Sequence, residues 1–310
     1  MINNKLAFVF PGQGSQAVGM LADLADNAEV KQTFEQASAA LGYDLWDLIQ
    51  NDSEGKLNQT DYTQPALLCA SVAIYRAWQA ANGDEPAVLA GHSLGEYSAL
   101  VCAGVLSLEQ AVRLVEKRGQ FMQQAVPAGT GAMYAIIGLD DQSIIDACAQ
   151  AAEQQVVSAV NFNSPGQVVI AGNKEAVERA GALCKDAGAK RALPLPVSVP
   201  SHCALMKPAA EQLASEFANV TFNSPTVDVI NNVDVATLTD ADSIKDALIR
   251  QLYSPVRWTE TIEKMADMGI ETVIEMGPGK VLSGLVKRIN KQLNCASVNS
   301  AETLTSTLEG

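Results

Sequence analysis

A serine between two glycines is the feature of this chain that most directly suggests catalysis. The pentapeptide Gly91-His92-Ser93-Leu94-Gly95 has the G-x-S-x-G form of a nucleophile elbow, a sharp strand-to-helix turn that exposes the serine hydroxyl. An apolar run at 86–90 precedes it and a helix-like run at 96–105 follows it. This context predicts that Ser93 is a covalent nucleophile and that the backbone N–H of Leu94 faces a developing oxyanion. The alternative is a glycine-rich turn without a catalytic role.

A serine nucleophile needs a base, and the chain contains only two histidines. His92 adjoins Ser93, and because neighbouring side chains on a tight elbow point apart, we expect it to line the pocket. His202 is therefore the predicted general base, the alternative being a histidine that only satisfies a loop carbonyl. Glu96 lies too close to the elbow to be an obvious third member. A dyad, with a backbone carbonyl holding the histidine, is as consistent with the sequence as a triad.

A second glycine turn follows the strand-like run at 6–10. Its sequence, Pro11-Gly12-Gln13-Gly14-Ser15-Gln16-Ala17, has the G-x-G-x-x-A form of a dinucleotide fingerprint. That fingerprint requires a second strand ending in an acid about 20 residues later, whereas 30–41 has helical periodicity. We favour a bent loop whose Gln13 N–H serves the same oxyanion as Leu94. The run Gly277-Pro278-Gly279-Lys280 lacks the spacing of a phosphate-binding loop, and it predicts a cap and turn.

These residues require a scaffold, and the hydrophobic periodicity predicts one of the α/β class. Strand-like runs alternate with amphipathic helical runs outside residues 128–199, a pattern typical of a largely parallel sheet covered by helices. The predicted strands are 6–10, 87–90, 226–230 and 272–275, and the predicted helices are 29–41, 67–80, 108–125, 243–252 and 259–268.

The middle of the chain follows a different order, β-α-β-β-α-β, which is typical of a ferredoxin-like unit. The sequence thus predicts a large α/β domain of residues 1–127 and 200–310 with an inserted subdomain of residues 128–199, and a ligand cleft between them. Within the insertion the predicted elements are strand 133–137, helix 141–152, strands 156–162 and 167–171, helix 174–187 and strand 192–197.

Composition excludes several classes of protein. The 310 residues are 48% hydrophobic, with 21 Lys plus Arg against 35 Asp plus Glu. The formal charge of -14 argues against binding to nucleic acid or to an anionic membrane. The longest apolar stretch, 66–81, is broken by Arg76 and Gln79, so no membrane span is predicted. The sequence does not start with a leader-like segment, and we therefore expect a cytoplasmic protein. Six cysteines without C-x-x-C predict neither a disulfide scaffold nor a metal site.

Seven motifs in order give the chain a family resemblance that runs nearly end to end. It resembles the malonyl-CoA:acyl-carrier-protein transacylases of bacterial type II fatty acid synthesis. The motifs are Phe10-Pro11-Gly12-Gln13-Gly14-Ser15-Gln16, Gln64-Pro65-Ala66, Gly91-His92-Ser93-Leu94-Gly95-Glu96, Arg118-Gly119, Asn161-Phe162-Asn163-Ser164-Pro165, Pro200-Ser201-His202 and Gly277-Pro278-Gly279. The resemblance implies an α/β-hydrolase-like large domain with a ferredoxin-like insertion.

The resemblance also implies a reaction. Ser93 would attack the thioester of malonyl-CoA, release CoA, and pass the malonyl group to the phosphopantetheine thiol of acyl carrier protein. No cofactor is expected. In this family, the positions matching Gln13 and Leu94 supply the oxyanion hole through their backbone N–H groups, and the backbone carbonyl matching Gln251 orients the base. The position matching Arg118 anchors the malonyl carboxylate, which a planar guanidinium can bind in bidentate fashion. Further polar lining is expected from His92, Gln64, Asn161 and Asn163.

Acyl carrier proteins are acidic, so the net charge of this chain opposes their approach and docking requires a local basic patch. We expect that patch to include Lys190, Arg191, Lys287 and Arg288, on a monomeric enzyme. The elbow alone would equally suit a hydrolase that releases the acyl group to water. A dinucleotide-dependent oxidoreductase and a non-catalytic scaffold that binds carrier protein are two further hypotheses compatible with the sequence.

Overall fold

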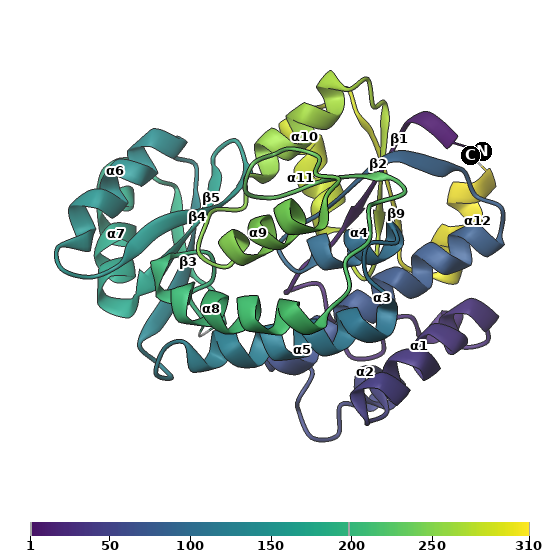
Figure 1. Ribbon diagram of the computed structural model, residues 1–310. Coiled ribbons are helices and arrows are strands. Elements are labelled where there is room, and N and C mark those ends of the chain that lie inside the picture. Colours follow the sequence, from purple (N-terminus) through teal and green to yellow (C-terminus); the bar gives the residue numbers. More distant parts are fainter. Residues whose placement is uncertain (1, 198, 310) are drawn as a thin grey trace.

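A parallel sheet of five strands forms the centre of the larger part of the protein in the computed structural model, which describes residues 2–197 and 199–309 (Figure 1). The strands are β1 Ile2–Phe10, β2 Glu85–Gly91, β7 Asp228–Ile230, β8 Thr272–Met276 and β9 Asn294–Val298. The spatial order is β7-β2-β1-β8-β9, and every neighbouring pair is parallel. The predicted parallel α/β architecture is confirmed.

Helices cover both faces of this sheet because the central strands are apolar on both sides. Phe8 of β1 points to one face, where its ring packs edge-on against Tyr75 and Trp78. Val9 points to the other face, into a cluster with Trp258. The helices of the larger part are α1 Ala28–Leu41, α2 Leu45–Asn51, α3 Thr60–Ala80, α4 Gly95–Cys102, α5 Leu108–Gln124, α8 Lys207–Glu216, α9 Ala241–Gln251, α10 Trp258–Asp267, α11 Val281–Ile289 and α12 Ala301–Glu309, with short 3-10 turns η1 Ala22–Leu24, η2 Ala204–Met206 and η3 Phe217–Asn219.

Several boundaries differ from the sequence-based expectation for identifiable reasons. Helix α3 begins at Thr60 rather than 67 and contains Pro65, because burial of nearly the whole helix outweighs the missing proline N–H. The edge strand β9 and helix α8 were not predicted. In the part of the chain that the structure describes, no helix combines the length and the apolar character that a membrane crossing requires.

A second, antiparallel sheet belongs to the inserted part of the chain. Its elements are β3 Gly131–Ile137, α6 Asp141–Ala152, β4 Val157–Ser164, β5 Gln167–Asn173, α7 Lys174–Asp186 and β6 Arg191–Pro194. The strand order is β4-β5-β3-β6, and α6 and α7 cover one face, on the left of Figure 1. This succession is the ferredoxin-like arrangement that the sequence predicts. Strand β6 ends before the predicted residue 197, at a point where Pro194 and Pro196 provide no N–H for pairing.

The backbone of the smaller sheet is joined directly to the larger part of the protein. Val256, just before α10, donates its N–H to Val160 O at 2.8 Å and accepts from Phe162 N at 3.0 Å. Two backbone hydrogen bonds thus join β4 to the segment before α10. The side chain of Asn161, between them, lines the cleft that contains Ser93.

Two glycines allow strand β2 to turn into helix α4 across the end of β1. A Cβ on Gly91 would lie 1.8 Å from the backbone carbon of Gly95, and a Cβ on Gly95 would lie 2.0 Å from the carbonyl oxygen of Phe10. Both contacts are with backbone, which cannot rotate away. Glycine is therefore required at both positions if the strand and the helix are to approach this closely.

We expect Gly91→Ala to lower the free energy of unfolding by about 3 kcal/mol or more, because the new methyl group overlaps backbone atoms. The matched control is Gly284→Ala in α11, where a Cβ meets nothing within 4 Å. That variant should gain about 1 kcal/mol from helix propensity. Urea unfolding followed by circular dichroism measures both, and equal stability of the two variants would contradict the packing argument.

Candidate active site

Most of the active-site residues that the sequence singles out line a cleft of about 120 Å³ between the two sheets. Ser93 and His92 come from the turn after β2, Gln64 from α3, Arg118 from α5 and Asn161 from β4. Apolar side chains close the remaining sides, among them Met122 from α5, Met133 from β3 and Leu195 just after β6. The cleft therefore lies at the carboxyl end of β2, where parallel α/β sheets usually bind ligands.

Ser93 has a left-handed backbone, with φ of 53°, which is rare for a residue other than glycine and is held by its neighbours. The side chain of Asn232, just after β7, supplies the brace. Its Oδ1 accepts the Ser93 N–H at 2.8 Å, and its Nδ2 donates to Gly91 O at 2.7 Å. One carboxamide thus connects both sides of the turn and fixes the direction of the Ser93 hydroxyl.

Ser93 and His202 form a hydrogen-bonded dyad. The distance from Ser93 Oγ to His202 Nε2 is 2.8 Å, and His202 Nδ1 lies 2.7 Å from the backbone oxygen of Gln251. Since that oxygen can only accept, Nδ1 carries the proton and Nε2 is left to accept from the serine. The backbone N–H of His202 also donates to Leu252 O at 3.0 Å. His202 is therefore held by carbonyls at the carboxyl end of α9, which have no partner within the helix.

Burial, and secondly the positive charge of Arg118, lower the pKa of His202 to about 3. The imidazole is therefore neutral at physiological pH and able to take a proton. Among the described residues no carboxylate contacts its Nδ1, so the arrangement is a dyad completed by a backbone carbonyl. Glu96, which the sequence argument set aside as an orienting acid, indeed bonds elsewhere.

The two predicted oxyanion donors lie beside the serine. Leu94 follows Ser93 at the start of α4, and Gln13 lines the same cleft from the loop after β1. Neither backbone N–H donates to another of the described residues. The loop reaches the elbow because Gly12 has no side chain, since a Cβ there would lie 2.5 Å from His92 O. This close approach to the protein's own backbone explains the first glycine of the G-x-G-x-x-A run without a bound dinucleotide.

Arg118 is a buried cation, with 1% of its surface exposed. Its Nη1 donates to Gln64 Oε1 at 2.9 Å and its Nη2 to Gln251 Oε1 at 3.0 Å, while Nη2 also lies 3.4 Å from Ser93 Oγ. None of the ion pairs among the described residues involves it, and its Nε has no hydrogen-bond partner there. A desolvated guanidinium with donors to spare, next to the nucleophile, favours an anionic ligand.

Of the other residues expected to line the cleft, the structure places some in its lining and one outside it. His92 Nε2 lies 2.7 Å from Asn163 Oδ1, so Asn163 supports the His92 ring instead of lining the cleft. Burial lowers the pKa of His92, which keeps a second charge out of the cleft. Asn161 does line the cleft, and its Oδ1 has no hydrogen-bond partner among the described residues.

Two residues that sequence reasoning did not select complete the polar network. Asn232 braces the elbow, and buried Glu96 accepts hydrogen bonds from Asn232 N and Gln251 Nε2, both at 2.9 Å. A polar pair, Asn231-Asn232, directly after the short apolar β7 was the available signal. It could have placed Asn232 near the elbow, because the carboxyl ends of parallel strands share one edge of the sheet.

The four basic residues of the expected patch are exposed; Lys190 and Arg191 lie at the start of β6, and Lys287 and Arg288 in the last turn of α11. Arg288 Nη1 donates to Gln167 Oε1 at 2.6 Å. Gln167 pairs with Ile137, and Ile137 in turn pairs with Arg191. Because neighbouring strands lie about 5 Å apart, the pairs Lys190-Arg191 and Lys287-Arg288 border one region. No ion pair among the described residues uses any of the four.

The run Gly277-Pro278-Gly279-Lys280 forms the predicted turn before α11, but the cap of that helix comes from Glu275. The carboxylate of Glu275 accepts from the backbone N–H groups of Leu282 and Ser283 at 3.2 and 2.8 Å. The protein's own acid thus occupies the helix N-terminus that a phosphate would need.

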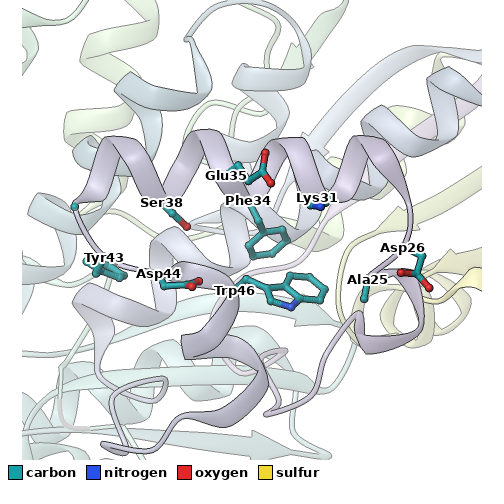
Figure 2. Close-up of a pocket in the computed structure, with 10 residues that line it drawn as sticks. Ala25, Asp26, Lys31, Phe34, Glu35, Ser38, Tyr43, Asp44 and Trp46 are labelled. Carbon is teal, nitrogen blue, oxygen red and sulfur yellow. The ribbon is translucent and has the colours of Figure 1, made fainter.

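A larger cavity of about 710 Å³ lies between α1 and α2 (Figure 2). The rings of Phe34 and Trp46, with centroids 4.9 Å apart, lie beside it. Its charged lining is mostly acidic, and neither histidine reaches it. Size alone would point to this cavity, but the chemistry points to the smaller cleft.

Comparison with known proteins gives the same fold and names an activity for the relatives. Residues 7–308 match the family described as acyl transferase domain. A malonyl CoA-acyl carrier protein transacylase of Escherichia coli strain K12 is 67% identical over 306 residues, which are 98% of this chain and 99% of that protein.

Solved structures agree with this chain over their whole length. An acyl carrier protein S-malonyltransferase from Vibrio cholerae has a TM-score of 0.96 at 69% identity, covering 98% of this chain and 99% of the other. A malonyl-transacylase in complex with its type II PKS acyl-carrier protein has a TM-score of 0.97 at 62% identity, with the same coverage.

The lowered pKa of His202 predicts a pH dependence of stability. Between about pH 6.5 and pH 3 the His202 imidazole is protonated in the unfolded state and neutral in the folded state. The free energy of unfolding therefore falls as the pH falls through this range. His202→Gln keeps a donor for Gln251 O and removes the titration. When the pH is lowered from about 7.5 to 5.5, the free energy of unfolding should fall in both proteins. The fall should be about 1.4 kcal/mol smaller in His202→Gln than in the parent. Urea unfolding at both pH values measures the difference, and identical losses would show that His202 titrates normally.

Proposed function

The chain belongs to the malonyl-CoA–acyl carrier protein transacylase family within the acyl transferases, and from this membership we propose that Ser93 carries the malonyl group between the two thiols. The protein is an acyltransferase of fatty acid biosynthesis that moves malonyl from malonyl-CoA to acyl carrier protein. The observation that most strongly supports the role of Ser93 is its 2.8 Å contact with the neutral His202, beside a buried arginine without a carboxylate partner.

In the first half-reaction His202 Nε2 takes the Ser93 hydroxyl proton while Oγ bonds to the thioester carbon of malonyl-CoA. The negative charge that develops on the carbonyl oxygen is stabilised by the backbone N–H groups of Gln13 and Leu94. When the carbon–sulfur bond breaks, the CoA sulfur takes the proton from His202. Throughout, the Nδ1–H bond to Gln251 O holds the ring and stabilises its positive charge.

The second half-reaction reverses these steps with a different thiol. The phosphopantetheine thiol of the carrier protein gives its proton to His202 and attacks the malonyl ester. The serine oxygen then leaves and takes that proton back. Each step exchanges an ester and a thioester without a change in oxidation state, so the proposed reaction requires no redox cofactor.

Arg118 is the proposed determinant of acyl specificity. The free carboxylate of a malonyl group on Ser93 would lie within reach of the guanidinium, whose Nη2 is 3.4 Å from Oγ. A charged pair that is desolvated together is strongly favourable, whereas an acetyl group offers the guanidinium no carboxylate. The monomeric state and the cytoplasmic location stay predictions from the sequence.

Incubation with malonyl-CoA alone, followed by intact mass spectrometry and peptide mapping, tests this mechanism. We expect a malonyl adduct on Ser93 and none in Ser93→Ala. Arg118→Ala should slow malonyl loading by roughly a hundredfold or more, since removing one member of a buried charge pair is worth about 3 kcal/mol or more. Its acetyl loading should rise relative to malonyl loading. Equal loss for both acyl groups would refute the anchor role, and free malonate as the main product with carrier protein present would indicate a hydrolase.

We also propose that the carrier protein docks on the basic region formed by Lys190, Arg191, Lys287 and Arg288. Their exposure, their lack of ion pairs among the described residues and their position bordering one region support this surface. Elsewhere the acidic chain repels an acidic partner.

Lys287→Glu should raise the KM for acyl carrier protein by roughly fivefold at low salt, because the reversal replaces attraction by repulsion. Lys31→Glu on α1 changes the net charge equally at an exposed site outside the proposed surface and should leave this KM within about twofold. The difference should shrink as salt screens the charges. Equal effects of the two reversals would place the docking surface elsewhere.

A further inference from the structure

A buried carboxylate under the elbow has no part in the mechanism so far. Glu96 is 2% exposed and lies in the first turn of α4. Its Oε2 accepts from the backbone N–H of Asn232 and from Nε2 of Gln251, both at 2.9 Å. It thus contacts both residues that hold the catalytic dyad, Asn232 behind Ser93 and Gln251 behind His202.

The contact with Gln251 decides which way that carboxamide faces. Gln251 Oε1 accepts from Arg118 Nη2 at 3.0 Å, and Nε2 donates to Glu96 and also to Ser93 O at 3.0 Å. A guanidinium can only donate, and an ionised carboxylate can only accept. If the amide were reversed, donors would face donors at Arg118 and acceptors would face acceptors at Glu96. Glu96 and Arg118 therefore fix a single orientation between them.

The same arrangement is an ion pair bridged by an amide. Arg118 and Glu96 do not form a direct ion pair, but the Gln251 carboxamide connects them through two hydrogen bonds. Two buried charges of opposite sign stabilise each other across one amide group because the surrounding protein screens them weakly.

We propose that Glu96 is a positioning residue for malonyl selection: through Gln251 it holds Arg118 in place, and it balances the arginine charge until the malonyl carboxylate arrives. This inference rests on the proposed role of Arg118 as the malonyl anchor. It adds that the anchor depends on a carboxylate that touches neither substrate nor nucleophile.

Charge balance then links malonyl binding to proton uptake. The groups that act on Glu96 are Arg118 from α5, Tyr97 beside it on α4, and Asp234 after β7. Asp234 is paired with Arg250 on α9, and His202, on the far side of Gln251, is neutral. Burial raises the pKa of Glu96 to about 7. A second carboxylate beside Arg118 raises it further, so that Glu96 takes up a proton as malonyl enters.

The direction of the pH effect follows. Because binding takes up a proton above the pKa of free Glu96, malonyl-CoA should bind less tightly as the pH rises beyond about 7. Acyl groups without a carboxylate should lack this dependence. In Glu96→Gln the KM for malonyl-CoA should be flat over the same range, because the amide oxygen keeps both hydrogen bonds but cannot titrate.

Three variants separate the proposed role from simple stabilisation, each measured by malonyl loading from malonyl-CoA without carrier protein. Glu96→Ala should lose roughly tenfold or more in kcat/KM, the effect of one unsatisfied buried partner. Glu96→Gln should keep it within about threefold at neutral pH. The matched control is Glu275→Ala, since Glu275 is also a fully buried acid that accepts two backbone N–H groups, but at α11. Glu275→Ala should have a lower free energy of unfolding, while its kcat/KM for malonyl loading, counted per folded molecule, should stay unchanged.

Failure of the Glu96 proposal can be distinguished from failure of the proposed function. Acyl-enzyme formation on Ser93 in the parent protein tests the function by itself. With that adduct present, normal malonyl loading by Glu96→Ala would overturn the positioning role, and so would an unchanged pH profile in Glu96→Gln. Equal loss in Glu96→Ala and Glu275→Ala would likewise assign the effect to folding.

Discussion

The close crossing of three backbone segments at the elbow is the constraint on which the rest of the site depends. Strand β2, helix α4 and the end of β1 approach so closely that Gly91 and Gly95 can carry no side chain. This crossing forces Ser93 into a left-handed conformation, and Asn232 holds it there from the neighbouring strand. The nucleophile is thus rigid before any substrate arrives, which is what covalent catalysis on a small acyl group requires.

A single buried cation dominates the electrostatics of the cleft. Both histidines are kept neutral by burial, and the nearby carboxylate of Glu96 is held one amide away from Arg118. A neutral acyl group gains nothing from such a cleft, whereas a carboxylate completes it. The same cation lowers the pKa of His202, so the group proposed to select the substrate also keeps the base ready for it.

The inserted sheet contributes one wall of the cleft. The backbone pairing of Val256 with β4 attaches that wall to the segment before α10, and Asn161 of β4 lines the cleft. Helix α9 contributes in another way, because its last carbonyls hold His202 by backbone and ring. Carbonyls at a helix end need partners in any case, and here they replace the orienting acid of a triad without adding a charge.

Local patterns in the sequence predicted the elbow, the alternation of most strands and helices and the succession of the inserted unit, because turn glycines and hydrophobic periodicity act within a few residues. The count of two histidines selected His202. The family resemblance supplied the roles of Arg118 and Gln251, which no periodicity reveals. Only the tertiary structure decided that Asn163 supports His92 from behind and that Asn232 and Glu96 connect the dyad to Arg118. These contacts join distant parts of the chain, as between Glu96 and Gln251, which are separated by 155 positions. Their geometry exists only once the carboxyl ends of the parallel strands meet at one edge of the sheet.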